Sequence, residues 1–176
     1  RFAVKLKVAG QRIRFTDLVH GPIEFDTHVI EDFIIQKSDG YPTYHFACVV
    51  DDHDMEISHV IRGDDHISNT PKQILIYQAF GWKIPEFAHL PLVFGADKTP
   101  LSKRHGAVSL SAYRREGYLP EALLNYLALL GWSSGRNQEV FTLDELVQEF
   151  SLNRVHKTNA CFDPEKLKWI NSEHIR

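Results

Sequence analysis

The chain has 176 residues, of which 43% are hydrophobic and 24% charged, the composition of a soluble globular protein long enough to bury a sizeable core. No apolar run reaches membrane-spanning length, and no secretory signal opens the chain. The net charge of −3 excludes a uniformly basic nucleic-acid-binding protein.

Charge is distributed unevenly along the chain. Residues 1–97 carry a net charge of −5, and residues 98–176 carry +2. Any RNA contact therefore requires a local basic patch, although a solvated charged surface would show the same residues. The candidate patch consists of Lys98, Lys103, Arg104, Arg114 and Arg115.

Two features concern the setting of the chain. Cys48 and Cys161 belong to no CxxC pair, so they predict free thiols in a reducing compartment, and the cytoplasm is the expected location. The first residue is Arg1 rather than methionine. Such a start fits either a piece of a longer protein or a processed mature chain, and we favour the piece.

The first 43 residues are predicted to be rich in β-structure. Apolar and polar residues alternate over residues 2–8 and 13–16, which predicts two strands joined as a hairpin at Gly10. A further strand is expected over residues 33–37, ended by the turn signal at residues 38–40.

The next segment, residues 44–97, has the pattern of an α/β layer. A helix is predicted from a cap at Asn69, with Pro71 in its first turn, to a stop at Gly81. Around it, three apolar runs predict buried strands: 46–50, 59–63 and 90–94. The order strand, strand, helix, strand predicts an α/β fold that lacks the earlier half of a doubly wound nucleotide-binding sheet.

From residue 109 onward the chain is predicted to be helical. One helix is expected to begin at Pro120, and another after the capping box formed by Thr142 and Glu145. A last helix is expected to begin at Asp163-Pro164.

Two acidic clusters lie near the ends of predicted strands. They are residues 51–54 (Asp-Asp-His-Asp) and residues 63–66 (Gly-Asp-Asp-His). Their carboxylates and histidines could serve a two-metal hydrolase. For residues 51–54 we expect a surface turn instead, whereas residues 63–66 suit a ligand site because ligands bind at strand ends in α/β sheets.

Neither GxGxxG nor GxxxxGK[ST] occurs, so any ATP site must be of another kind.

A basic segment follows at residues 101–106 (Leu-Ser-Lys-Arg-His-Gly). Adjacent cations in a polar loop could close over a triphosphate and stabilise the charge that develops during phosphoryl chemistry. A lone Lys-Arg pair is equally compatible with a solvated surface.

The order of several blocks resolves this ambiguity, because it resembles glutamyl-tRNA synthetases, which are class I aminoacyl-tRNA synthetases. The Leu-Ser-Lys-Arg segment is similar to their KMSKS loop. Matching blocks run along nearly the whole chain in the family's order: 38–44, 49–55, 59–66, 69–73, 79–82 and 117–123.

The resemblance implies roles for individual residues. Tyr44 and Arg62 would line the glutamate pocket, with Arg62 binding a carboxylate of the amino acid. Asp65 would lie near the ATP ribose, and the backbone of Leu92 and Val93 would face the adenine. The KMSKS-like motif would comprise Pro100, Leu101, Ser102, Lys103 and Arg104. In that motif Lys103 would contact ATP, with Ser102 and Arg104 supporting it, and Arg114 and Arg115 would contact tRNA.

The sequence departs from the family pattern in two ways. Pro100 stands where the loop usually has its first lysine, and Lys98 could partly replace that lysine. The His-x-Gly-His motif, which stabilises the triphosphate from the other side, does not occur in the chain. The resemblance therefore implies an internal piece of the enzyme, without the half that carries this motif and without the anticodon-binding region, and this piece would be inactive alone.

The resemblance also implies a domain organisation. Residues 1–43 would end the acceptor-binding insertion, residues 44–97 would form the second half of the Rossmann-type catalytic domain, and residues 98–176 would form the KMSKS-like loop and a helical stem-contact domain. The whole enzyme would be a cytoplasmic monomer that ligates glutamate to the acceptor end of tRNA(Glu) through a glutamyl-adenylate. It would use ATP with Mg²⁺ as substrate, hold no tightly bound metal in this segment and make no contact with a membrane.

Three alternatives remain open from the sequence. Within the family, the chain could belong to a glutaminyl-tRNA synthetase, although Arg62 favours glutamate over glutamine. It could also belong to a truncated homologue that glutamylates a tRNA base, although the intact Leu-Ser-Lys-Arg loop argues against that form. From other classes, it could be a metal-dependent hydrolase built on the acidic clusters or a stand-alone RNA-binding module.

Overall fold

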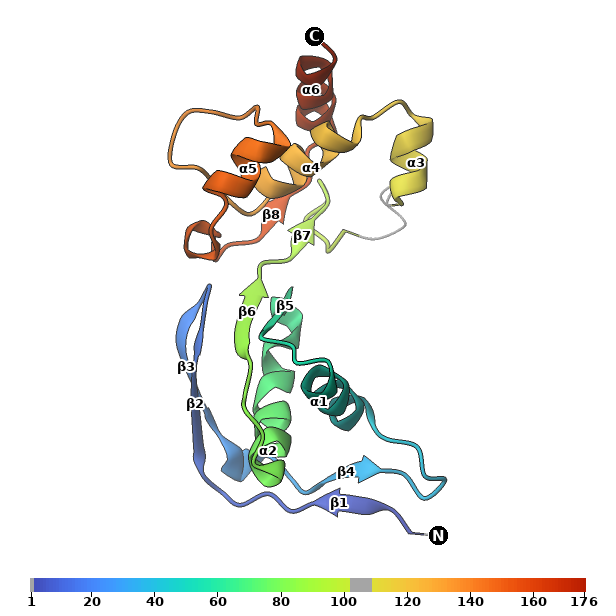
Figure 1. Cartoon of the computed structure of the whole chain (residues 1–176), viewed down its shortest axis with the longest axis vertical. Helices are drawn as coiled ribbons and strands as arrows, with labels where there is room; N and C mark the ends of the chain where they lie inside the picture. Colours follow the sequence, from blue (N-terminus) through green and yellow to red (C-terminus); the bar gives the residue numbers. More distant parts are fainter. Residues whose placement is uncertain (1, 102–108) are drawn as a thin grey trace. The chain divides into compact units, whose positions relative to one another are not determined.

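The computed structural model describes residues 2–101 and 109–176, which form two compact units, Arg1–His89 and Leu90–Arg176 (Figure 1). Each unit has its own hydrophobic core. The predicted functional divisions after residues 43 and 97 stay predictions. Within the described residues, no helix is long and apolar enough to cross a membrane.

A four-stranded sheet organises the first unit. Its strands lie in the order β3 (Gly21–Asp26), β2 (Arg12–Asp17), β6 (Glu86–Leu90) and β5 (His59–Gly63). Strand β2 pairs antiparallel with β3, and its last residue, Asp17, pairs in parallel with Phe87 of β6. A separate antiparallel pair is formed by β1 (Val4–Leu6) and β4 (Phe33–Gln36), and the short 3₁₀ helix η1 covers Thr27–Val29.

The predicted strands at the start of the chain are confirmed, but the predicted hairpin between them is wrong. Strand β2 forms its hairpin with β3, because Gly21 adopts a left-handed φ of 85° and the carboxylate of Asp17 accepts from the backbone N–H groups of the turn. Strand β1 instead pairs with the distant β4. Alternation predicts a strand, whereas its partner depends on contacts remote in sequence.

The predicted strand at residues 46–50 is also wrong, because Tyr44–Asp54 forms helix α1. A short apolar run has no periodicity that separates a strand from a buried helix. Helix α1 packs against α2 (Thr70–Phe80) and β4 (Figure 1). Val49 of α1 is fully buried, and Phe46 stacks on Phe80. The acidic residues 51–54 therefore lie in the last turn of a helix rather than in a surface turn.

Helix α2 begins differently from the prediction and ends as predicted. A 3₁₀ helix, η2 (Asp64–Asn69), runs directly into it, and Asn69 makes no side-chain cap but lies 3.0 Å from His66 Nδ1. Gly81 closes the helix in the left-handed conformation with φ 68°. Buried residues of both helices and both sheets form two core clusters of the unit. The first contains Ile13, Ile74, Leu75 and Phe87, and the second contains Ile35, Val49, Ile76 and Tyr77.

The second unit is mostly helical. Its helices are α3 (Leu110–Arg115), α4 (Pro120–Leu129), α5 (Leu143–Glu149), the 3₁₀ helix η4 (Leu152–Arg154) and α6 (Pro164–Ile175). The capping box of Thr142 and Glu145 and the predicted helix starts are confirmed. The predicted strand at residues 90–94 is interrupted at Pro91, and its remainder, β7 (Val93–Phe94), pairs in parallel with β8 (Ala160–Cys161).

Gly81→Ala tests the C-terminal stop of α2. An added Cβ would meet no atom within 4 Å, so the cost arises from the left-handed backbone alone. We expect the free energy of unfolding to fall by about 1 kcal/mol, measured by denaturant titration. Gly81→Asn is the control and should cost less, because asparagine tolerates this conformation. Equal losses for both variants would contradict the explanation.

Candidate functional site

Three residues predicted to bind substrates lie in consecutive elements of the first unit. Tyr44 begins α1 and is 56% exposed, and Arg62 lies in β5 and is partly buried. Asp65 is the second residue of η2, and its side chain is 56% exposed. A ligand could therefore reach both flanking side chains, while Arg62 lies deeper in the fold.

One face of α1 bears on Arg62. Tyr44, Cys48 and Asp52 are spaced four residues apart and so share that face. Burial raises the pKa of Tyr44, and the neighbouring Cys48 raises it further. Burial also raises the pKa of Asp52, although the positive charge of Arg62 opposes that shift. The face thus combines a phenol, a thiol and a carboxylate around a cation.

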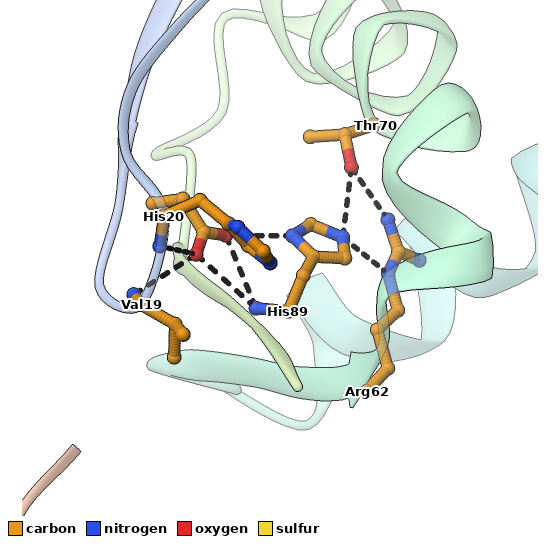
Figure 2. A network of polar contacts seen from close by, with 6 residues as sticks. Val19, His20, Arg62, Thr70 and His89 are labelled. Carbon is orange, nitrogen blue, oxygen red and sulfur yellow. Dashed lines mark hydrogen bonds and ion pairs between the residues drawn. The ribbon is translucent and has the colours of Figure 1, made fainter. Parts of the chain in front are cut away.

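The guanidinium of Arg62 is held by two buried side chains (Figure 2). Its Nε–H donates to His89 Nε2 at 3.1 Å, and Nη2–H donates to Thr70 Oγ1 at 2.8 Å. His89 and Thr70 are both 0% exposed. Burial lowers the pKa of Arg62, while Tyr44, Cys48 and nearby carboxylates oppose the shift. The ring of Phe87 lies below the cation, 5.7 Å from Cζ to the ring centroid.

Asp17 completes the network from the other side of His89. Its Oδ2 lies 2.6 Å from His89 Nδ1, and its Oδ1 accepts from the backbone N–H groups of Val19 and His20, each at 2.9 Å. Figure 2 shows the His89 ring between the turn that carries Val19 and His20 and the side chain of Arg62. Burial favours the neutral form of Asp17, but the hydrogen bonds from His20, Val19 and His89 outweigh it and lower the pKa of the carboxyl.

Protonation states follow from this geometry. Because Arg62 Nε can only donate, His89 Nε2 must accept, and the ring proton lies on Nδ1. Burial lowers the pKa of His89, although its hydrogen bond to Asp17 opposes that shift. The network therefore consists of an ionised carboxylate, a neutral imidazole and a cation. This network can hold the guanidinium of Arg62 in a fixed position for binding an anion.

Sequence analysis did not identify Asp17, Thr70 or His89. One sequence feature did mark His89: it interrupts the apolar sequence from Phe87 to Leu90 and lies two residues before Pro91. No comparable feature marked Asp17, because its role depends on a contact with His89, which follows it by 72 residues.

The predicted residues of the second unit take up different positions. The Leu92 N–H donates to Asn159 Oδ1, and the Val93 carbonyl accepts from the N–H of Leu101. Arg114 and Arg115 lie exposed in the last turn of α3. Lys98 adopts a left-handed φ of 59° two residues before Pro100. Ser102, Lys103 and Arg104 lie outside the described residues.

The two acidic clusters do not form a metal site in this fold. Residues 51–54 end α1 and residues 63–66 enter η2. In the part of the chain that the structure describes, no group of three or more His, Cys, Asp and Glu side chains could hold a metal ion. The hydrolase alternative thus loses the arrangement on which it depended.

Comparison with known proteins gives a consistent family. The model of the family "tRNA synthetases class I (E and Q), catalytic domain" matches residues 1–169. A glutamate–tRNA ligase of Carboxydothermus hydrogenoformans is 59% identical over 174 residues, covering 98% of this chain and 36% of the relative. One of Desulforamulus reducens is 57% identical over 167 residues, covering 95% and 35%. The chain therefore spans little more than a third of these curated relatives.

Solved structures agree with the sequence relatives. The crystal structure of a glutamate tRNA ligase from Elizabethkingia meningosepticum CCUG26117, in complex with its amino acid, matches with a TM-score of 0.89 and 39% identity, covering 98% of this chain and 38% of that one. The glutamate-tRNA synthetase of Elizabethkingia anophelis matches with a TM-score of 0.88 and 39% identity, covering 98% and 39%. The family resemblance inferred from the motifs is confirmed, and the chain belongs to the class I tRNA synthetases of the E and Q type, within their catalytic domain.

Proposed function

We propose that the protein containing this chain ligates glutamate to tRNA(Glu) through a glutamyl-adenylate. The observation that carries the proposal is the partly buried Arg62, whose guanidinium is fixed on one edge by His89 and Thr70. Guanidinium is a bidentate partner for a carboxylate, and a carboxylate is what distinguishes glutamate from glutamine. The glutamate–tRNA ligases that match this chain at 57% and 59% identity support the same reaction.

The proposed reaction has two steps. An oxygen of the α-carboxylate of glutamate attacks the α-phosphorus of ATP, the bond to the bridging oxygen breaks, and pyrophosphate leaves. A hydroxyl of the terminal tRNA ribose then attacks the acyl carbon, and AMP leaves. The protein positions the reactants and stabilises charge, so no covalent enzyme intermediate is needed.

Different residues of this chain would bind the different substrates. Tyr44 and Arg62 would bind glutamate, and the exposed carboxylate of Asp65 would accept hydrogen bonds from the ATP ribose. Leu92 and Val93 would face the adenine. Mg²⁺ would arrive with the ATP phosphates, as it commonly does.

The remaining assignments concern the loop, the tRNA and the setting. Pro100, Leu101, Ser102, Lys103 and Arg104 would form the loop that closes on ATP, and Arg114 and Arg115 would contact the tRNA stem. The enzyme would be monomeric and cytoplasmic.

Pyrophosphate exchange by the full-length protein tests this function. We expect pyrophosphate exchange that depends on glutamate. We also expect the protein to charge tRNA with glutamate, and to show little exchange or charging with glutamine. Activity with glutamine in preference to glutamate, or with neither, would refute the proposal.

The isolated 176-residue chain should show no glutamate-dependent exchange, even with tRNA present. It lacks the His-x-Gly-His motif, which by resemblance supplies transition-state stabilisation from the other side of the triphosphate. The full-length protein at equal concentration is the positive control. Measurable exchange above the no-glutamate background would contradict this expectation.

Arg62→Ala in the full-length protein should impair glutamate use more than ATP use. Loss of a charge-assisted bidentate contact costs roughly 1.5–3 kcal/mol, or about ten- to a hundredfold in kcat/KM for glutamate. Arg12→Ala is the matched control, because Arg12 is an exposed arginine of the same unit paired with Glu24. An unchanged kcat/KM for glutamate in Arg62→Ala would remove Arg62 from the pocket.

Lys103→Ala should slow adenylate formation far more than it weakens ATP binding. A charge that meets the phosphates mainly in the transition state affects the rate constant and leaves ground-state affinity largely unchanged. We expect a loss on the order of 3–4 kcal/mol, about a hundred- to a thousandfold, in single-turnover measurements. Arg104→Ala should have a smaller effect, and Lys168→Ala, on α6, should have none. A loss below about fivefold for Lys103→Ala would exclude this loop from catalysis.

A further inference from the structure

We propose that Asp17 and His89 are positioning residues for Arg62, which hold its guanidinium in the orientation that leaves one edge open to a carboxylate. Because Asp17 is 1% exposed and His89 is 0% exposed, both would act through Arg62 and not by contact with the amino acid. This inference rests on the proposed function, in which Arg62 binds glutamate, and it adds two residues that no motif of the chain contains.

The side-on edge of the Arg62 guanidinium is occupied by protein. This edge carries Nε–H and one Nη2–H, which point in the same direction. The acceptors are His89 Nε2 and Thr70 Oγ1, and each accepts one hydrogen bond from the guanidinium. Because His89 Nε2 carries no proton, the Thr70 hydroxyl also donates to it, at 3.2 Å. Within residues 2–101 and 109–176 no hydrogen bond is made by Nη1. The end-on edge, formed by Nη1 and the second hydrogen of Nη2, therefore remains for a ligand carboxylate.

Asp17 determines which nitrogen of His89 can accept. The short contact between Asp17 Oδ2 and His89 Nδ1, 2.6 Å, places the ring proton on Nδ1 and leaves the lone pair on Nε2. The backbone N–H of His89 also donates to the same carboxylate, at 3.1 Å from Oδ2. Asp17 thus fixes both the tautomer and the position of the ring.

Burial makes this dependence strict. Asp17 is 1% exposed and His89 is 0% exposed, so bulk water is not available to replace either partner. If His89 Nε2 carried a proton, its N–H would face the Nε–H of Arg62. The side-on edge of the guanidinium would then lose the acceptor for its Nε–H. The other charged or titratable groups that act on His89 are Arg62 on β5 and His20 in the turn after β2, and both disfavour its protonated form.

The pair also connects two parts of the chain with different predicted roles. Asp17 ends β2, inside the predicted acceptor-binding insertion, whereas His89 and Arg62 belong to the predicted catalytic half. The parallel pairing of Asp17 with Phe87 brings the carboxylate to His89. The open edge of Arg62 therefore depends on a residue outside the catalytic half.

Asp17→Asn in the full-length protein is the first test. The asparagine Oδ1 can still accept from the turn, but its amide must donate toward His89 Nδ1, which moves the ring proton to Nε2. We expect kcat/KM for glutamate to fall about tenfold or more, with most of the change in KM, while KM for ATP changes less than about twofold. Rates are divided by the concentration of active sites, measured by titration, so that a loss of folded protein does not lower the reported kcat/KM.

A double-mutant cycle separates positioning from a general structural role. If Asp17 acts through Arg62, then Asp17→Asn should cause no further loss of kcat/KM for glutamate in an Arg62→Ala background. The matched control is Thr27→Val, because Thr27 is buried in the same unit and, among the described residues, its hydroxyl forms hydrogen bonds with Ala9 and Gln11 alone. It should lower thermal stability without changing KM for glutamate.

A second pair of variants avoids any dependence on the folding of Asp17→Asn. His89→Leu removes the acceptor for Arg62, whereas His89→Gln places an amide oxygen near the position of Nε2. We expect a large rise in KM for glutamate in the first and recovery of at least part of the loss in the second. Equal kinetics for the two variants, or equal effects of Asp17→Asn with and without Arg62, would overturn the positioning role. Failure of the proposed function is distinct, because the wild-type protein would then not use glutamate at all.

Discussion

The ionised carboxylate of Asp17, buried at the end of β2, is the constraint on which the first unit depends. Removing a carboxylate from water costs several kcal/mol unless hydrogen bonds compensate it. Here the donors are the backbone N–H groups of Val19, His20 and His89 and the ring of His89. The turn after β2, the parallel pairing of β2 with β6 and the orientation of His89 therefore all satisfy the same charge, and none can change without exposing it.

The carboxylate of Asp17 also influences Arg62, because it orients the His89 ring that accepts a hydrogen bond from the arginine. The neutral His89 stabilises the arginine by accepting a hydrogen bond, but it does not neutralise its charge. Asp52 and Asp65 act on Arg62 electrostatically, yet neither forms a hydrogen bond with it within the described part of the chain. A partly buried cation whose side-on edge is satisfied, but which makes no hydrogen bond to a carboxylate among the described residues, favours an anionic ligand, because the ligand can supply that hydrogen-bonded partner.

Local signals allowed part of this structure to be predicted from sequence. The left-handed Gly81, the capping box at Thr142 and the helix start at Pro164 each depend on a few neighbouring residues, and each is present. The hairpin partner of β2 and the helix at residues 44–54 depend on packing with distant segments, and both predictions failed.

The candidate site divides in the same way. Arg62 belongs to a motif that is contiguous in sequence, so the resemblance could identify it. Asp17 belongs to no such motif, and only the pairing of β2 with β6 brings it to His89. Residues that bind a substrate directly can be found by their local pattern. Residues that orient them through a sheet become visible only when strand order and register are known.

Rigidity at Arg62 has a consequence for selectivity between glutamate and glutamine. A carboxylate offers two acceptors to the end-on edge of a guanidinium, whereas an amide offers one acceptor and one donor, so that one N–H of the amide would face an N–H of the arginine. A mobile arginine could rotate to make a single hydrogen bond to the amide oxygen and avoid the opposed donors. Arg62 cannot do so without giving up its bonds to His89 and Thr70, both buried. In the proposed function, the buried pair of Asp17 and His89 therefore prevents the rotation of Arg62 that would accommodate glutamine. The difference in charge between glutamate and glutamine then becomes a difference in binding free energy.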